Sequence, residues 1–310
     1  MEWSGIDVDQ FGKVPQRIRH RLHHHPLFST EALGRLIEAT DRNNYYVNTM
    51  DISAHNARSR REGEIRNLSG VEAIEAVAKG RLWILLLQPE KFVPEYRDLV
   101  REIYAEIAAH VPGFEPFGEK LSILISSPRI QVYYHCDVPG QTLWQVRGSK
   151  QVYVYPNKAP WIHQPSLERI MLGEKHEISM PYERAFDEAA TVYDLQPGEM
   201  LHWPLNAPHR IVNNDCLNVS FTTEHYTRDI RRSFIVHCGN GVLRQQLGLK
   251  EKALSRQTEG PNYWSKAAVA AAWKLSGMQK KRRQTFKVDF AVDPSAPDCV
   301  RTIPAYEFSK

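Results

Sequence analysis

The chain has no long hydrophobic run and no regular cysteine pattern. Its longest apolar stretches, "LWILLL" and "AAVAAAW", fall far short of the roughly 20 residues that cross a bilayer, so we expect no membrane span. The start, "MEWSGIDVDQFGKV", has no basic segment followed by an apolar one, which predicts no secretory signal. The four cysteines lack CxxC spacing, which argues against a structural zinc site and against a disulfide framework. We therefore expect a cytoplasmic protein.

The composition is not extreme in any direction either. Hydrophobic residues make up 42% and charged residues 25% of the 310 residues, which is typical of a soluble globular protein. The net charge is only +4, with basic runs at 17–25, 57–66 and 279–283. Such runs usually form solvated surface and only weakly indicate nucleic-acid or acidic partners. We expect no nucleic-acid partner.

The first segment, residues 1–114, is predicted to be a helical flank with one strand. Ser29 or Thr30 can cap a helix in "FSTEALGRLIEA", and Ser69 with Glu72 has capping-box spacing in "SGVEAIEAVAKG". "PEYRDLVREIYAEIAAHVPG" carries one apolar stripe, as an amphipathic helix does. The short apolar run "RLWILLLQP" is typical of a buried strand.

The second segment, residues 115–226, changes to a period of two and predicts a β-rich core. Short strand-like stretches separated by Gly, Pro or Asn favour a sandwich or barrel; they are "KLSILISS", "RIQVYYHCD", "TLWQVRGSKQVYVYP", "ATVYDL", "EMLHWP" and "RIVNNDCLNVSFTTEHY". The third segment, residues 227–310, is predicted to be a helical extension followed by an extended tail from about residue 284. Small residues in "SKAAVAAAWKLSG" could let two chains dock as a homodimer.

The stretch "YYHCDVPGQTLWQVRGSK" (133–150) contains the candidate metal ligands. Alternate residues of a strand point to one face, so Tyr133, His135 and Asp137 project together, whereas Tyr134 and Cys136 face the other way. "DLQPGEMLHWPLNAPHRIV" supplies a third ligand, because His209 opens the strand that follows its loop. Two histidines and one carboxylate form the facial triad that leaves positions open on a non-haem Fe(II).

These motifs resemble the cupin-fold JmjC-type oxygenases, which use Fe(II) and 2-oxoglutarate, and in particular the branch that includes the asparaginyl hydroxylase acting on hypoxia-inducible factor. The resemblance covers about residues 119–226. It consists of the HxD motif, the lysine thirteen residues after its aspartate, and "PGEMLHWPLNAPH" with its histidine twelve residues after the proline. The resemblance implies a double-stranded β-helix, of jelly-roll or cupin type, flanked by α-helices.

The resemblance also implies how a cosubstrate would be bound. Lys150 stands where the family has a lysine that pairs with the distal carboxylate of 2-oxoglutarate, and no arginine competes for that role in "CLNVSF". The family's threonine is replaced by Val132, and Tyr133, Ser122 or Ser126 could substitute for it. The family's asparagines near the cosubstrate appear as Gln141 and Ser220, which can still hydrogen-bond.

The sequence therefore predicts an Fe(II)- and 2-oxoglutarate-dependent dioxygenase. His135, Asp137 and His209 would hold the metal, and a C–H bond of a protein, peptide or small molecule would be hydroxylated. One alternative is a non-catalytic metal-binding cupin that acts as a binding module. A second is a chromatin- or nucleic-acid-associated demethylase, which would bind DNA in a salt-dependent way.

Overall fold

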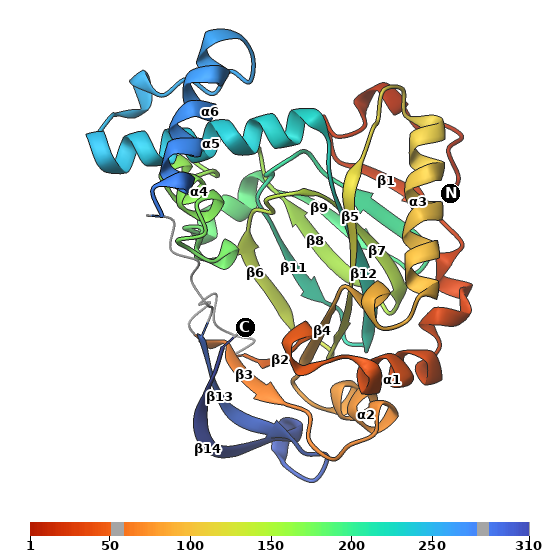
Figure 1. The fold of residues 1–310 in the computed structure, drawn as a ribbon. Coiled ribbons are helices and arrows are strands. Elements are labelled where there is room, and N and C mark those ends of the chain that lie inside the picture. Colours follow the sequence, from red (N-terminus) through yellow and green to blue (C-terminus); the bar gives the residue numbers. More distant parts are fainter. Residues whose placement is uncertain (51–58, 278–284, 310) are drawn as a thin grey trace.

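Two β-sheets face one another at the centre of the chain (Figure 1). The computed structural model describes residues 1–50, 59–277 and 285–309. The larger sheet has ten strands in the order β1-β10-β7-β12-β5-β4-β2-β3-β13-β14, and the smaller has four in the order β6-β11-β8-β9. The strands are β1 (Gln16–Arg19), β2 (Tyr45–Thr49), β3 (Arg61–Glu64), β4 (Trp83–Leu87), β5 (Phe117–Ser126), β6 (Gln131–His135), β7 (Gly140–Arg147), β8 (Lys150–Val154), β9 (Thr191–Leu195), β10 (Glu199–His202), β11 (His209–Asn213), β12 (Asn218–Tyr226), β13 (Thr285–Val292) and β14 (Val300–Ser309).

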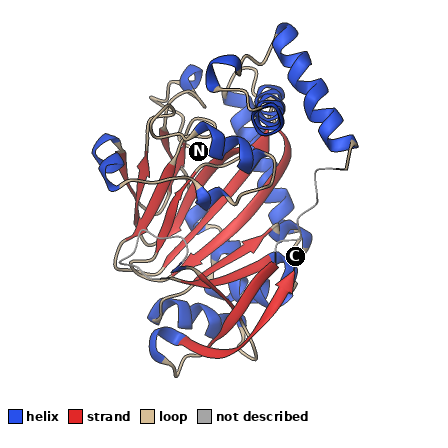
Figure 2. Cartoon of the chain, turned by 90° about the vertical axis from the view of Figure 1, so that its left-hand side faces the viewer, coloured by secondary structure: helices blue, strands red, loops and turns tan. Residues whose placement is uncertain are grey.

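Helices cover the outer faces of both sheets (Figure 2). They are α1 (Thr30–Ala39), α2 (Gly70–Lys79), α3 (Glu95–His110), α4 (Gln164–Met171), α5 (Arg228–Leu247) and α6 (Gly260–Leu275). The apolar faces of α1, α2 and α3 pack on the large sheet, whereas α4 and α5 cover the small one. The predicted caps are present, because the Ser29 hydroxyl accepts from the Ala32 N–H and Ser69 forms a capping box with Glu72.

The space between the sheets is filled by apolar side chains at one part and polar side chains at another. Apolar residues of both sheets and of the loop before β11 form a small cluster there: Leu143, Val152, Val154, Leu195, Leu201, Trp203, Ala207 and Ile211. Tyr134 and Cys136 instead pack outward with α4 and α5, which confirms the predicted alternation along β6. The side chains that point between the sheets are therefore the ones available to a ligand.

The large sheet extends further than the sequence indicated at both ends. The expected extended tail forms a hairpin, β13–β14, and β13 pairs in parallel with β3. The short strand β1 adds to the opposite edge by pairing with β10. Most side chains of β14 and half of those of β1 are exposed, so neither strand carries a clear apolar period. The boundaries at residues 114 and 226 stay a prediction.

The expected lack of a membrane span and the basic runs concern segments outside the core. No helix among the described residues is both long and apolar enough to cross a bilayer. The basic run at 279–283 and the first residues of the run at 57–66 lie outside the residues that the structure describes.

A stack of three aromatic rings holds the large sheet against the N-terminal helices. Phe221 of β12 stacks on Phe28 at 4.8 Å between ring centroids and on Trp144 of β7 at 5.4 Å. Phe221 and Trp144 are completely buried, and the Trp144 indole donates to the Thr223 hydroxyl at 3.0 Å. This stack fixes β12 and β7, whose opposite faces line the space between the sheets.

We expect Phe221→Ala to lower the free energy of unfolding by about 3–5 kcal/mol, because it leaves a cavity between two rings. Chemical denaturation of the apo-protein measures this loss. Phe117→Ala is the control, since that ring lies in the same sheet but is 40% exposed, and it should lower the free energy far less. Equal losses in the two variants would contradict the role of the stack.

Candidate metal centre

Strand pairing brings the three predicted ligands together. β6 ends at His135, β11 begins at His209, and the two residues are direct partners in the antiparallel ladder. Asp137 follows two residues after β6, at the same end of the small sheet. His135 Nε2 lies 3.6 Å from Asp137 Oδ1, and His209 Nε2 lies 3.4 Å from Asp137 Oδ2. All three side chains are buried.

Both imidazoles are held in the form that a metal requires. His135 Nδ1 bonds to the Tyr133 carbonyl at 2.7 Å, and His209 Nδ1 bonds to the Ala207 carbonyl at 3.0 Å. A carbonyl only accepts, so Nδ1 carries the proton and Nε2 keeps its lone pair. Burial, together with the neighbouring His135, keeps the pKa of His209 well below its usual value, so its ring stays neutral.

The Asp137 carboxylate lacks a partner that a cation would supply. Its Oδ2 atom is buried and accepts no hydrogen bond from the residues that the structure describes. Burial raises the pKa of Asp137, whereas His135 and a hydrogen bond from Trp203 act in the opposite direction. The Asn206 side-chain amide donates to the Asp137 main-chain carbonyl at 2.6 Å and so fixes the loop that precedes His209.

The geometry fits a divalent metal bound from one side. Ligands about 2.1 Å from a shared ion and at right angles lie about 3 Å apart, close to the separations seen here. Among residues 1–50, 59–277 and 285–309, this is the one group of three such side chains whose ligand atoms lie within 4.8 Å of one another. Two histidines and a carboxylate that leave further positions open suit Fe(II).

Lys150 lies inside the same barrel and has no anionic partner among the described residues. It begins β8, four residues before the strand position that pairs with His209, which places its backbone about 13 Å along the sheet from that row. The side chain is 2% exposed, and Nζ donates to the Ser220 hydroxyl of β12 at 2.9 Å. Burial lowers the pKa of Lys150 to about 7. A bound carboxylate would restore its charge.

The structure brings together some of the other predicted cosubstrate residues but not all. Ser220 contacts Lys150, whereas Gln141 pairs with Glu224, four residues further along β12. The Tyr133 hydroxyl bonds to the Ser59 hydroxyl at 2.6 Å. Lys150 and Ser220 therefore lie together in one part of the barrel, and Gln141 lies further along the same strands.

The two serines that could replace the family's threonine, Ser122 and Ser126, differ in their surroundings. The Ser126 hydroxyl already accepts from the Asn213 amide at 2.8 Å. Ser122 of β5 is the direct strand partner of Thr222, which shares a face of β12 with Ser220. Sequence reasoning missed Thr222 and Asn213, which carry no motif and are identified only by the pairing of the sheets.

Two half-buried carboxylates near the metal ligands were also missed. Burial and repulsion by Asp137 raise the pKa of Glu177 to about 8 and that of Glu224 to about 7. Glu177 begins a short 3-10 helix, η7 (Glu177–Ser179), which contacts β6. No sequence signal marks this segment, because only the tertiary fold places it against the small sheet.

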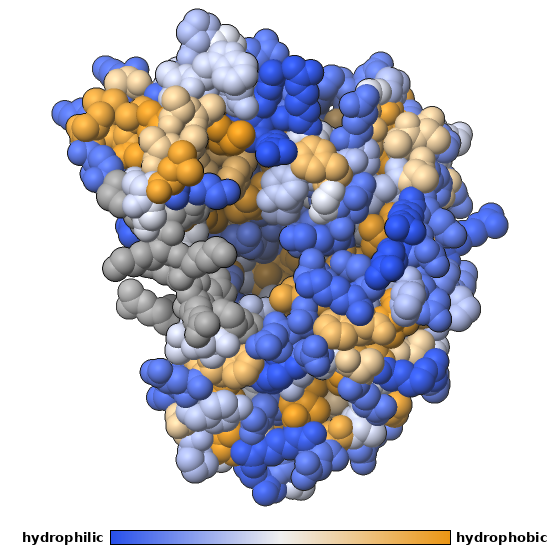
Figure 3. All heavy atoms as spheres, viewed as in Figure 1, coloured by the Kyte–Doolittle hydropathy of each residue, from blue (hydrophilic) through white to orange (hydrophobic). Residues whose placement is uncertain are grey.

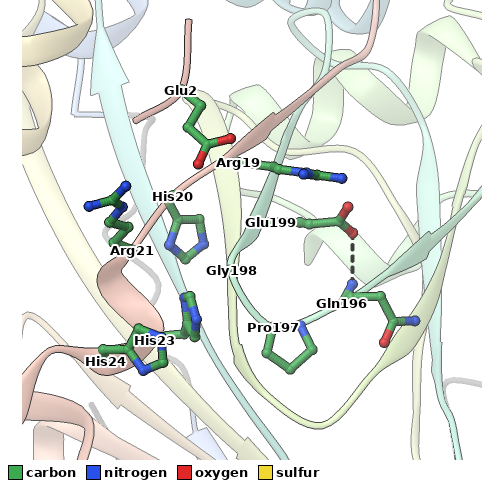
Figure 4. A pocket seen from close by; sticks show the side chains of 10 residues that line it. All are labelled: Glu2, Arg19, His20, Arg21, His23, His24, Gln196, Pro197, Gly198 and Glu199. Atoms are coloured by element: carbon green, nitrogen blue, oxygen red, sulfur yellow. Dashed lines mark hydrogen bonds between the residues drawn. The ribbon is translucent and has the colours of Figure 1, made fainter.

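The histidines at 20–25 form a separate hollow rather than a second metal centre (Figure 4). His20, His23 and His24 line it together with Gly198 and Glu199. The Leu22 N–H donates to His20 Nδ1 at 3.1 Å, so the neutral His20 ring carries its proton on Nε2 and cannot ligate through that atom. Within the described part of the chain, these histidines do not take part in any group of three ligand atoms that lie within 4.8 Å of one another.

Solved structures with a similar fold include several of one bacterial oxygenase. An X-ray structure of YcfD from Escherichia coli is 14% identical, with a TM-score of 0.50, over 91% of this chain and 69% of that chain. The YcfD ribosomal oxygenase in complex with cobalt and 2-oxoglutarate gives 14% identity and a TM-score of 0.47 over 89% and 67% of the two chains. Its complex with cobalt and succinic acid gives 13% and 0.47 over 91% and 68%. No protein-family model and no curated protein sequence matches this chain.

The first of these likenesses shows the fold. The chain is a double-stranded β-helix of the cupin, JmjC-like kind with flanking helices, which confirms the fold class predicted from the sequence.

We expect His209→Ala to weaken Mn(II) binding by more than about a hundredfold, because even partners outside the ligand set are worth about 10- to 100-fold. Electron paramagnetic resonance of free Mn(II) measures the affinity. His24→Ala removes an exposed histidine outside the triad and serves as the control, which should bind Mn(II) like the wild type. Retained binding in His209→Ala would put the distal ligand in doubt.

Proposed function

We propose that this chain is an Fe(II)- and 2-oxoglutarate-dependent oxygenase that hydroxylates a C–H bond of a protein, peptide or small molecule. One observation carries the proposal: a facial triad (His135, Asp137 and His209) and a buried cation without an anionic partner (Lys150) lie in one barrel. A metal-binding module without a cosubstrate would have no use for that lysine. The motif spacing and the fold support the same function.

The residues of the chain would bind and orient the reactants. Fe(II) with 2-oxoglutarate and O2 supplies the oxidising chemistry when bound. Lys150 would neutralise the distal carboxylate of 2-oxoglutarate, and Ser220 would hold the ammonium in place. The apolar cluster of the barrel, which includes Leu143 and Leu201, would exclude water from the reacting groups.

A substrate would reach this site from one face of the molecule. Figure 3 shows the face seen in Figure 1 hollowed near its centre, over the region of β6 and β11. A hollow at the end of the barrel that holds the metal ligands is where a substrate would approach. The cytoplasmic location expected from the sequence stays a prediction.

The iron-loaded chain should convert 2-oxoglutarate to succinate, and Lys150→Ala should abolish this turnover while leaving metal binding intact. An unpaired buried charge costs about 3–5 kcal/mol, which corresponds to a loss of cosubstrate affinity of a few hundredfold or more. Calorimetry with Mn(II) in place of iron gives the 2-oxoglutarate affinity, and mass spectrometry of a treated lysate identifies products heavier by one oxygen. Equal 2-oxoglutarate affinities in the two proteins would refute the role of Lys150.

The affinity for 2-oxoglutarate should also fall as the pH rises. Because burial lowers the pKa of Lys150 to about 7 in the absence of an anion, the free site is uncharged above that pH and must take up a proton to bind. We expect a loss of about tenfold per pH unit above about pH 7. Calorimetry in two buffers of different ionisation enthalpy detects the proton uptake. An affinity that does not change with pH would mean that the lysine stays charged in the empty site.

We further propose that two chains associate through the C-terminal helices. Trp264 and Leu275 of α6 are 68% and 87% exposed, and the small residues Ala268, Ala271 and Ala272 lie on the same exposed stripe. Apolar residues also gather over the corner formed by α5 and α6 (Figure 3).

Sedimentation equilibrium should therefore give twice the monomer mass for the wild type and the monomer mass for Leu275→Glu, since a charge in an apolar contact is unfavourable. Lys91→Glu, which reverses a charge at an exposed position outside α5 and α6, should leave the dimer intact. A monomeric wild-type chain at micromolar concentration would exclude this association.

A further inference from the structure

A second cavity lies outside the barrel, and none of the proposed metal or cosubstrate residues lines it. It has a volume of about 750 Å³, a size typical of small-molecule sites. Its walls come from residues 157–165, from the loop at Leu205 and Asn206, from α5, and from the segment after α5. The cavity is thus formed by elements far apart in the sequence.

A histidine with a fixed proton position lines this cavity. His237 of α5 is 8% exposed, and burial lowers its pKa to about 4, so its ring is neutral near neutral pH. The Gln164 amide nitrogen lies 2.9 Å from His237 Nδ1 and can only donate, so the ring proton sits on Nε2. This N–H has no hydrogen-bond partner among the described residues.

The orientation of the Gln164 amide is fixed by its other contacts. Its oxygen accepts from the Arg256 guanidinium at 3.2 Å, and its nitrogen lies 3.2 Å from Glu168 Oε1. A flipped amide would place its oxygen against the Glu168 carboxylate and its NH2 group against the Arg256 guanidinium. The direction of the His237 N–H therefore follows from the network and not from an arbitrary choice of tautomer.

The charged groups around the cavity leave one positive charge in excess. Three cations (Lys158, Arg244 and Arg256) line it with one carboxylate (Glu251), and a second carboxylate outside the lining (Glu168) pairs with Arg244. Arg244 is paired with both carboxylates, because its guanidinium bonds to each of them at 2.7 Å.

The other two cations have donors to spare. Arg256 is held loosely, at 4.0 Å from Glu251, and is 59% exposed. Lys158 makes no ion pair with any residue that the structure describes. A single carboxylate matches a surplus of one charge better than a phosphate dianion does.

We propose that this cavity binds the carboxylate group of a ligand through the His237 N–H, Lys158 and Arg256. The apolar residues Ile162 and Leu205 line the same cavity and would contact the carbon part of that ligand. The carboxylate belongs either to a free small molecule or to an acidic side chain of a peptide.

Benzoate is a suitable probe for the free carboxylate, with benzamide as its uncharged counterpart. Calorimetry is done on the full chain with Mn(II) and one equivalent of 2-oxoglutarate, so that the barrel is filled and the cavity is left free. We expect saturable binding of benzoate and much weaker binding of benzamide. Lys158→Ala and Arg256→Gln should each raise the benzoate Kd by about tenfold, as expected for loss of one charge-assisted hydrogen bond.

A control variant separates this cavity from the rest of the protein. Lys91→Ala removes an exposed lysine outside the cavity and should not change the benzoate Kd. The assay needs no turnover, so a failed oxygenase assignment leaves its result interpretable.

A terminally blocked peptide with one glutamate, compared with its glutamine counterpart, tests the peptide-borne source in the same assay. Binding of either carboxylate that weakens in Lys158→Ala and Arg256→Gln supports the site and identifies the source. The proposal is overturned if neither carboxylate binds, if the amides bind equally well, or if both variants bind like the wild type.

Discussion

The register between β6 and β11 determines the metal centre. Because His135 and His209 are direct partners across the antiparallel ladder, their imidazoles leave the sheet side by side, and Asp137 reaches them from just beyond the strand end. A shift of one residue would turn one histidine to the outer face, where Tyr134 and Cys136 pack against helices. The hydrogen bonds from both Nδ1 atoms to main-chain carbonyls then orient the rings.

The barrel tolerates several charged groups that would be unfavourable without ligands. Asp137 has an unsatisfied buried oxygen, and Lys150 is buried with only a hydroxyl partner. Both conditions are unstable in isolation, since a buried charge needs a counter-charge or hydrogen bonds. A cation bound at one end of the barrel would satisfy Asp137, and an anion at the other end would satisfy Lys150. The barrel therefore has the charge pattern of a site for a metal and a carboxylate.

The second cavity, which His237 and Lys158 line, is organised differently from the barrel. At its walls Gln164, Glu168 and Arg244 are linked by hydrogen bonds, and the His237 Nε2–H and the Lys158 ammonium have no partner among the described residues. In the barrel, by contrast, Asp137 Oδ2 accepts no hydrogen bond and Lys150 bonds only to a hydroxyl within the described part of the chain. One site is organised by its own hydrogen bonds, and the other depends on what binds in it.

The sequence by itself determined the parts of this protein that depend on local pattern. The alternation through Tyr133, His135 and Asp137, the caps at Ser29 and Ser69, and the spacing to Lys150 and His209 all rest on short-range geometry, which a single sequence carries. Only the tertiary structure decided which distant segments meet. β13 joins β3, Glu177 lies against β6, Ser220 contacts Lys150, and His237 shares a cavity with Lys158. Such contacts depend on the packing of whole sheets and helices, which leaves no periodic signal in the residues that make them.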